Sequence, residues 1–184
     1  MTYEIDIAGL KRALPICKLN DELAIGAFVI FGDVELTEHA ARELLKRAPE
    51  FDYIVAPEAK TIPLAYEMSR LSGKTYIIAR KKAKAYMTGI FESTVQSITT
   101  AGVQTLIIDS TDAEKIKNSR ILIVDDVIST GASLRATEEL VNKAEGNIVA
   151  KCAILAEGDA FYREDITVLA QLPLFTADGT PILK

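Results

Sequence analysis

The sequence has few cysteines and histidines, the residues that build disulfide frameworks, zinc sites and many active sites. Among 184 residues, Cys17 and Cys152 are too few and too widely separated for a disulfide framework or a zinc site. We therefore expect reduced thiols in a cytoplasmic protein, with Cys152 as inert core. The single histidine, His39, falls on the surface of an expected helix, so we do not expect it to be catalytic.

Long apolar runs and an excess of positive charge are also absent. No apolar run approaches the roughly 18 residues that a membrane span requires, and the N-terminus lacks the apolar segment of a signal peptide. The net charge of −5 argues against broad binding of nucleic acid. The chain is long enough for one globular domain with a substantial core.

Apolar strands alternate with amphipathic helices along most of the chain. Such alternation is typical of an α/β fold in which helices flank a parallel sheet. A hairpin of Val95–Thr100 with Val103–Ile108 is also expected, after a mobile loop over 85–95, whereas residues 1–22 show no clear pattern. The expected strands are Leu23–Phe31, Tyr53–Ala56, Thr75–Ala79, Arg120–Val124, Asn147–Ala156 and a last strand, Val168–Leu172; the expected helices are Glu35–Ala48, Ile62–Leu71 and Ala132–Lys143.

The stretch Ile121–Ser133, ILIVDDVISTGAS, carries the most specific chemical signal. Four apolar residues indicate a buried strand, which Asp125 and Asp126 end. A loop of small and hydroxyl-bearing residues then leads into a helix, so its backbone N–H groups and the helix N-terminus suit an anion. Carboxylates at this place accept hydrogen bonds from ribose hydroxyls or lie near a metal. The pattern predicts a sugar-phosphate site.

Two further groups of polar residues follow other expected strands. Glu58 comes after Tyr53–Ala56, and Arg80-Lys81 comes after Thr75–Ala79. Because ligands bind at the carboxyl ends of the strands in such sheets, we expect these residues and the two aspartates to share one active site.

Other proteins also end an apolar strand in acidic residues. A nucleotide hydrolase needs GxxxxGK[ST], but Met68 takes the place of the first glycine before Gly73-Lys74-Thr75, and the elements come in the wrong order. A receiver domain carries its acids near its start, and too little chain follows Asp126 for that fold. The remaining alternative, a strand end with solvated acids, is disfavoured by the phosphate-type loop directly after them.

The segment VDDVISTGAS resembles the phosphoribosyl pyrophosphate (PRPP) signature of type I phosphoribosyltransferases. Ile54–Tyr66 is similar to the pyrophosphate-loop region of the adenine phosphoribosyltransferase subfamily, and Ile78–Ala85 to its basic segment. Val149–Leu174 is similar to its C-terminal part, so the resemblance covers most of residues 25–175.

This resemblance implies a single phosphoribosyltransferase domain over residues 1–184. Its fold would be a Rossmann-like parallel sheet flanked by helices, with a flexible active-site loop and a small hood from about 1–30 and 157–184. The enzyme would transfer the 5-phosphoribosyl group of PRPP to a purine base, with adenine favoured, and release pyrophosphate in purine salvage. The implied partners are PRPP, a nucleobase and a second copy in a homodimer, without nucleic acid or membrane.

The resemblance also implies roles for the acidic pair and the loop after it. Asp125 and Asp126 would be catalytic, contacting the ribose and offsetting positive charge on its ring. Mg²⁺ would be bound through the pyrophosphate, with water-mediated contacts to the two aspartates. The 5′-phosphate would lie in the loop formed by Ser129, Thr130, Gly131, Ala132 and Ser133, of which Thr130 and Ser133 also suit a helix cap.

The resemblance also implies residues for the pyrophosphate and for the base. Lys60 stands where the family usually carries arginine, so it keeps the charge and loses the bidentate fork. The base-binding candidates are Phe31 and Val127, while Phe28 is expected in the core. The residues implied in pyrophosphate binding are Glu58, Ala59, Lys60, Thr61, Arg80, Lys81 and Lys84.

One segment departs from the subfamily's pattern. Adenine-type enzymes follow the flexible loop with a strand of the form S-x-E-Y-G, but here Ser97–Gly102 reads SITTAG, with Thr99 near the place of the glutamate. Threonine cannot do the same proton chemistry at neutral pH, and Glu92 is the candidate substitute. This departure leaves open a PRPP-binding regulator without catalysis and a transferase for another base, such as xanthine or a pyrimidine.

Overall fold

Five parallel strands form the central sheet of the computed structural model, which describes residues 1–96 and 103–182. The order is β10 (Thr167–Leu172), β9 (Asn147–Glu157), β8 (Arg120–Ile128), β4 (Tyr53–Pro57) and β5 (Thr75–Ala79).

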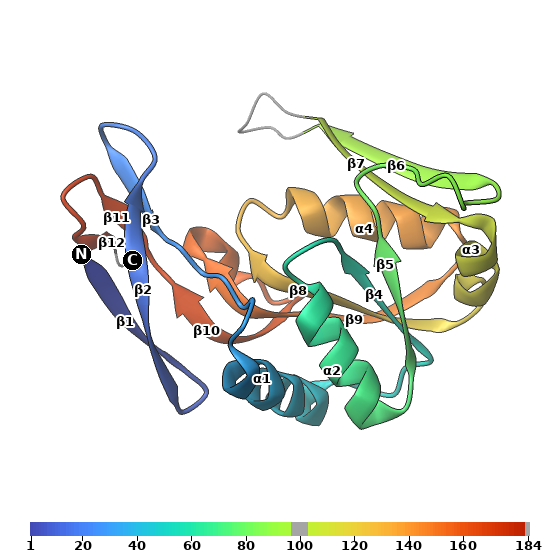
Figure 1. The fold of residues 1–184 in the computed structure, drawn as a ribbon, viewed down its shortest axis with the longest axis horizontal. Coiled ribbons are helices and arrows are strands. Elements are labelled where there is room, and N and C mark those ends of the chain that lie inside the picture. The colour runs from blue at the N-terminus through green and yellow to red at the C-terminus, as the bar shows by residue number, and fades with distance from the viewer. Residues whose placement is uncertain (97–102, 183–184) are drawn as a thin grey trace.

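Helices cover both faces of this sheet (Figure 1). Ile54 and Ala56 of β4 lie in one apolar cluster with α1 (Val34–Arg47) and α2 (Ile62–Ser72). Val55, between them, lies in a second cluster with α3 (Ser110–Ile116) and α4 (Ala132–Lys143). The two clusters follow the alternation of side chains along a strand. The predicted α/β class is therefore confirmed.

The two ends of the chain build a second, antiparallel sheet. Its strands are β1 (Thr2–Ile7), β2 (Leu10–Lys18), β3 (Leu23–Gly26), β11 (Leu174–Thr176) and β12 (Pro181–Ile182). The prediction that Val168–Leu172 is the last strand was therefore wrong. The prediction for Leu23–Phe31 was too long, because the ladder of β3 ends at Gly26. Beyond it, Phe28 and Ile30 are buried, as expected for Phe28.

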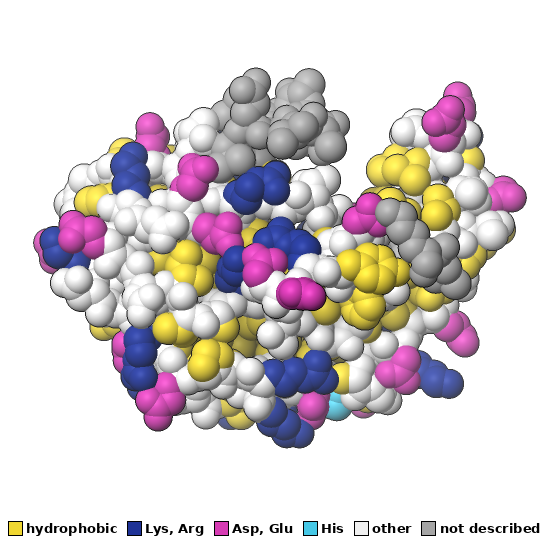
Figure 2. All heavy atoms as spheres, turned by 180° about the vertical axis from the view of Figure 1, so that it is seen from behind, with side chains coloured by type: hydrophobic (Ala, Val, Ile, Leu, Met, Phe, Trp, Pro, Cys, Tyr) yellow, Lys and Arg dark blue, Asp and Glu magenta, His cyan; other side chains and the backbone are white. Residues whose placement is uncertain are grey.

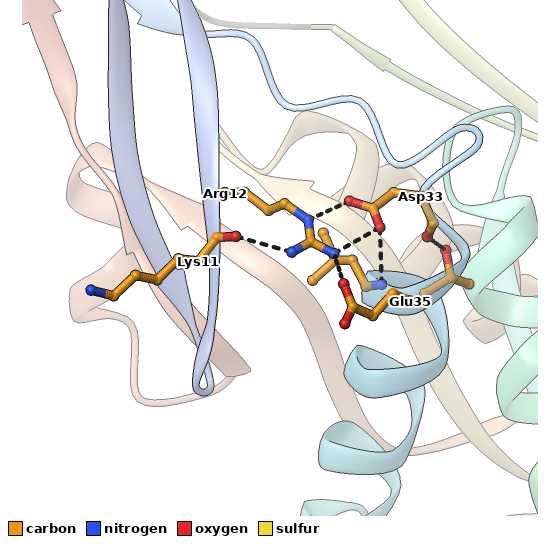
Figure 3. Close-up of polar contacts among 6 residues, drawn as sticks. Lys11, Arg12, Asp33 and Glu35 are labelled. Carbon is orange, nitrogen blue, oxygen red and sulfur yellow. Dashed lines mark hydrogen bonds and ion pairs between the residues drawn. The ribbon is translucent and has the colours of Figure 1, made fainter.

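An arginine joins this second sheet to the helical layer (Figure 3). Arg12 of β2 donates from Nε and Nη2 to the two carboxylate oxygens of Asp33, at 2.6 and 2.9 Å, and its Nη2 reaches Glu35 at 2.8 Å. Asp33 also caps α1, since its Oδ1 accepts from the Leu36 N–H at 3.0 Å. The paired arginine holds the pKa of the Asp33 carboxyl below its ordinary value. One carboxylate thus begins α1 and anchors the hairpin.

The predicted hairpin is present but begins earlier than expected. β6 (Ile90–Gln96) pairs with β7 (Val103–Asp109), so the strand occupies most of the segment predicted as loop. Ser93 Oγ donates to Glu139 of α4 at 3.0 Å, and mutual 2.7 Å hydrogen bonds join Arg80 to Ile107. These contacts hold the hairpin against the body. Its predicted turn and Thr99 lie outside the described residues. Within the described ranges, no helix is long and apolar enough to cross a membrane.

Candidate active site

A pocket of about 510 Å³ opens at the carboxyl ends of β4, β5 and β8. Seen from behind, the molecule is hollowed between its two lobes, and acidic and basic side chains gather in that hollow (Figure 2). Predicted residues from the three strand ends thus meet, while Thr105 and Leu106 of β7 were not predicted. The pocket is lined by Pro57, Glu58, Ala59, Lys60, Thr61, Lys81, Thr105, Leu106, Asp125, Asp126, Val127 and Ser133.

Asp125 and Asp126 lie inside β8, which continues past the predicted end at Val124 because Asp125 and Val127 still pair with β9. Both are buried, at 5% and 6% exposure. Asp125 Oδ1 accepts from Thr61 Oγ1 at 2.9 Å and from the Asp126 N–H at 2.8 Å. Burial, and then the charge of Asp126, raise the pKa of Asp125 above its ordinary value.

Asp126 has a different environment. Its buried Oδ2 accepts no hydrogen bond from the described residues but lies 3.0 Å from Lys60 Nζ. The same ammonium group is 3.4 Å from the carbonyl oxygen of Phe28. The arrangement offers a buried carboxylate whose counter-ion comes from the loop after β4. Such a carboxylate can accept hydroxyl donors or face a developing positive charge.

The raised pKa of Asp125 predicts a pH-dependent stability. An unfolded aspartate titrates at about pH 4, and the folded protein holds the proton of the Asp125 carboxyl more tightly. Wild-type stability should therefore fall as pH rises from about 4 through the folded pKa. Asp125→Asn cannot ionise, so its stability relative to wild type should be greater at pH 8 than at pH 5. Urea unfolding without ligands measures this.

Asp21→Asn is the control, because the Asp21 side chain is fully exposed beside Lys18. It should follow the wild-type pH profile. If Asp125→Asn and wild type differed in their free energy of unfolding by the same amount at pH 5 and pH 8, the raised pKa of Asp125 would be contradicted.

The loop after β8 encloses a smaller hollow of about 160 Å³, lined by Asp125 and residues 127–134. Gly131 has φ +75° and precedes α4, a backbone conformation that favours glycine. No side chain caps α4, although Thr130 Oγ1 accepts a long 3.4 Å hydrogen bond from the Ala132 N–H. Thr130 thus contacts the first amide of α4 weakly, while Gly131 is the N-cap residue and Ser133 lies inside the helix. The first amides of α4 remain suited to an anion.

Glu58 organises the basic segment after β5. Its carboxylate accepts from the Lys81 N–H at 2.7 Å and from Arg80 Nη1 at 3.2 Å. Burial pushes the Glu58 pKa upward, but these hydrogen bonds and cations outweigh it and lower the pKa. Lys81 lines the pocket with Lys60, whereas Lys84 lies in an exposed turn outside the lining. Cations thus flank the pocket from two loops.

The structure places only one of the two base-binding candidates at the pocket. Val127 lines both the main pocket and the smaller hollow. Phe31 is 54% exposed and lies outside the lining of either. Glu92 is exposed on β6 and does not line the pocket. Its backbone oxygen accepts from Lys143 Nζ at 2.9 Å.

An acidic pair, a phosphate-type loop and flanking cations thus meet at the carboxyl edge of the parallel sheet of an α/β protein. Residues 34–171 match the family model of the phosphoribosyl transferase domain, so the chain belongs to that family. It is similar to the adenine phosphoribosyltransferase of Thermosipho africanus, at 34% identity over 120 residues, which covers 64% of this chain and 68% of that protein. It is also similar to the adenine phosphoribosyltransferase of Thermotoga petrophila, at 32% identity over 130 residues, which covers 66% of this chain and 74% of that protein.

Solved structures agree on the fold. The adenine phosphoribosyltransferase of Thermoanaerobacter pseudethanolicus matches with a TM-score of 0.67 at 20% identity, covering 93% of this chain and 95% of that one. The Saccharomyces cerevisiae enzyme, solved with an imino-altritol bisphosphate and adenine, matches with a TM-score of 0.60 at 23% identity, covering 76% and 78%. The predicted type I phosphoribosyltransferase fold is confirmed.

Proposed function

We propose that the protein transfers the 5-phosphoribosyl group of PRPP to a purine base, with adenine as the favoured acceptor. The base nitrogen forms a bond to carbon 1 of the ribose as the bond to pyrophosphate breaks, with the electron pair leaving on pyrophosphate. The base gives up one proton to pyrophosphate or water, and the product is a nucleoside monophosphate. One observation carries this proposal: the buried acidic pair lies in a pocket that adjoins the loop before α4 and is flanked by cations. The preference for adenine rests on the names of the relatives.

Each part of PRPP has a group of suitable chemistry. The loop of residues 129–133 takes the 5′-phosphate through backbone N–H groups, hydroxyls and the start of α4. Asp125 and Asp126 face the ribose and offset positive charge that develops on its ring. Lys60, Lys81 and the Glu58-oriented Arg80 offset negative charge that grows on the leaving pyrophosphate.

Mg²⁺ enters, in this proposal, as part of the substrate, bound to the pyrophosphate oxygens. The described residues contain no cluster of three metal-ligating side chains. Two adjacent buried carboxylates, one with an Oδ2 that accepts no hydrogen bond from the described part of the chain, nevertheless suit an ion that substrate oxygens also bind. The ion supplies further positive charge beside the leaving group.

The base lies next to Val127 in this proposal, under a hood formed by the second sheet. We assign the protein to the cytoplasm because Cys17 and Cys152 are free thiols.

We also propose a homodimer. Val34 and Tyr66 are 67% and 55% exposed beside a largely apolar hollow of about 250 Å³ between α1 and α2, a surface that a second copy would cover. Light scattering in solution tests the dimer.

Pyrophosphate release tests the activity. The protein is incubated with PRPP, Mg²⁺ and, in turn, adenine, hypoxanthine, guanine, xanthine and uracil. We expect release with adenine. Release with another base alone would keep the reaction and change the acceptor. No release with any base would contradict the enzyme proposal. Retained binding of PRPP would then favour a PRPP-binding regulator without catalysis.

A further inference from the structure

A guanidinium group that forms no ion pair within the described residues lies at the start of α4. Arg135 belongs to the first turn of this helix, where the macrodipole already favours negative charge. Its Nη1 donates to the Thr130 carbonyl oxygen at 3.1 Å. None of the ion pairs among the described residues involves Arg135, and the first turn carries no acidic residue.

A second guanidinium group reaches the same loop from η1 (Gly158–Tyr162) and the segment after it. Arg163 is held by Asp165 through two hydrogen bonds, at 2.9 Å from Nε and 2.7 Å from Nη2. Asp165 also pairs with Lys151 of β9, whose ammonium group binds Glu138 of α4 at 2.6 Å. Arg163 is therefore fixed from two elements of the central fold.

Both guanidinium groups converge on one glycine. A Cβ atom at Gly131 would lie 2.8 Å from Arg163 Nη1 and 3.2 Å from Arg135 Nη1. Within this cluster, three cations (Arg135, Arg163 and Lys151) face two carboxylates (Glu138 and Asp165), and both guanidinium groups border Gly131. Glu157 and Asp159 line a separate hollow with Ser129 and Thr130. Neither arginine lines the pocket or the smaller hollow. They act through the loop and not by touching a ligand inside it.

We propose that Arg135 and Arg163 are positioning residues for the 5′-phosphate, holding the loop around Gly131 and supplying the positive potential that a phosphate dianion balances. This inference rests on the proposed function, because it assigns the anion in the loop to the 5′-phosphate of the donor. Arg135 holds the Thr130 carbonyl by a hydrogen bond, and Arg163 Nη1 packs against the open side of Gly131, where a Cβ atom would clash. Charges near a surface interact at an intermediate effective dielectric. Removing either cation should therefore weaken the affinity for ribose 5-phosphate about tenfold.

Four variants test the proposal: Arg135→Met, Arg163→Met, Arg135→Lys and Arg163→Lys. Calorimetry measures the binding of ribose 5-phosphate and of pyrophosphate, and steady-state assays measure KM for PRPP and kcat. We expect each Met variant to weaken ribose 5-phosphate binding and raise KM about tenfold, with kcat within about threefold and pyrophosphate binding within about twofold. Each Lys variant, which keeps the charge, should recover most of the loss. Arg42→Met is the matched control, because Arg42 pairs with Glu38 on α1, away from the loop.

The outcomes separate this inference from the function on which it rests. Wild-type affinity for ribose 5-phosphate in both Met variants would overturn the inference. Equal losses in the Lys and Met variants, with pyrophosphate binding also lost, would overturn it in favour of a purely structural role. A wild-type protein that binds ribose 5-phosphate but transfers no phosphoribosyl group from PRPP to any base would contradict the enzyme proposal, while the binding comparison still tests the arginines. A wild-type protein that does not bind ribose 5-phosphate would overturn both.

Discussion

Replacing Asp125 and Asp126 together with asparagine should lower kcat/KM for PRPP by about 10³-fold or more while the protein stays folded. Removal of one preorganised electrostatic group at a reacting centre typically costs about 10²–10³ in rate, and this double change removes two adjacent carboxyl groups. Folding should survive because asparagine keeps the shape and can still accept from Thr61 Oγ1. Pyrophosphate release and urea unfolding measure the two effects.

The control for this variant is Asp112→Asn. Asp112 lies on α3 and pairs with Lys115, outside the pocket lining. It should keep the wild-type rate. If the folded double variant also turned over at the wild-type rate, the assignment of the acidic pair to the ribose would be wrong.

Lys60→Met should give the second large loss, about 10²-fold in kcat/KM. Its ammonium group lines the pocket and is 3.0 Å from Asp126 Oδ2, so the change removes a cation for the leaving pyrophosphate and the counter-ion of a buried carboxylate. The Lys60 side chain is 47% exposed, so solvent screens the pair and the stability loss should be only roughly 1 kcal/mol. Initial rates at varied PRPP, together with urea unfolding, check both numbers.

Two further variants sharpen this result. Lys60→Arg restores the charge with a bidentate fork, so its kcat/KM should stay within about threefold of wild type. Lys82→Met removes a charge from the same basic run as Lys81, but Lys82 is exposed and does not line the pocket. Its rate should stay within about twofold of wild type. An equal loss in the Lys60 and Lys82 variants would show that general charge and not the Lys60 position is responsible.

Most of the central fold could be predicted because its signals are local. The strands β4 and β5 and the stretch Cys152–Ala156 of β9 are almost entirely apolar, as expected for strands buried on both faces. Helix α2 carries Pro63 in its first turn and ends at Gly73 with φ +70°. Each of these signals lies within a few residues of the element that it marks.

The second sheet and the true extent of β6 could not be predicted in this way. β3 pairs with β11, and their partner residues Ile25 and Leu174 lie near opposite ends of the sequence. β6 is a strand because it pairs with β7 and contacts α4 through Ser93 and Glu139. Pairing of this kind depends on a distant partner, which no window of sequence contains.

The sequence by itself determined the α/β class, the acidic pair and the small-residue loop before α4, because a strand followed directly by that loop is a local arrangement. Only the tertiary structure decided how these groups meet. It buries Asp125 against Thr61, places Lys60 beside Asp126, and brings Arg135 and Arg163 to Gly131. The physical reason is that burial and charge pairing are set by distances between segments far apart in the chain, and those distances exist only once the sheet has formed.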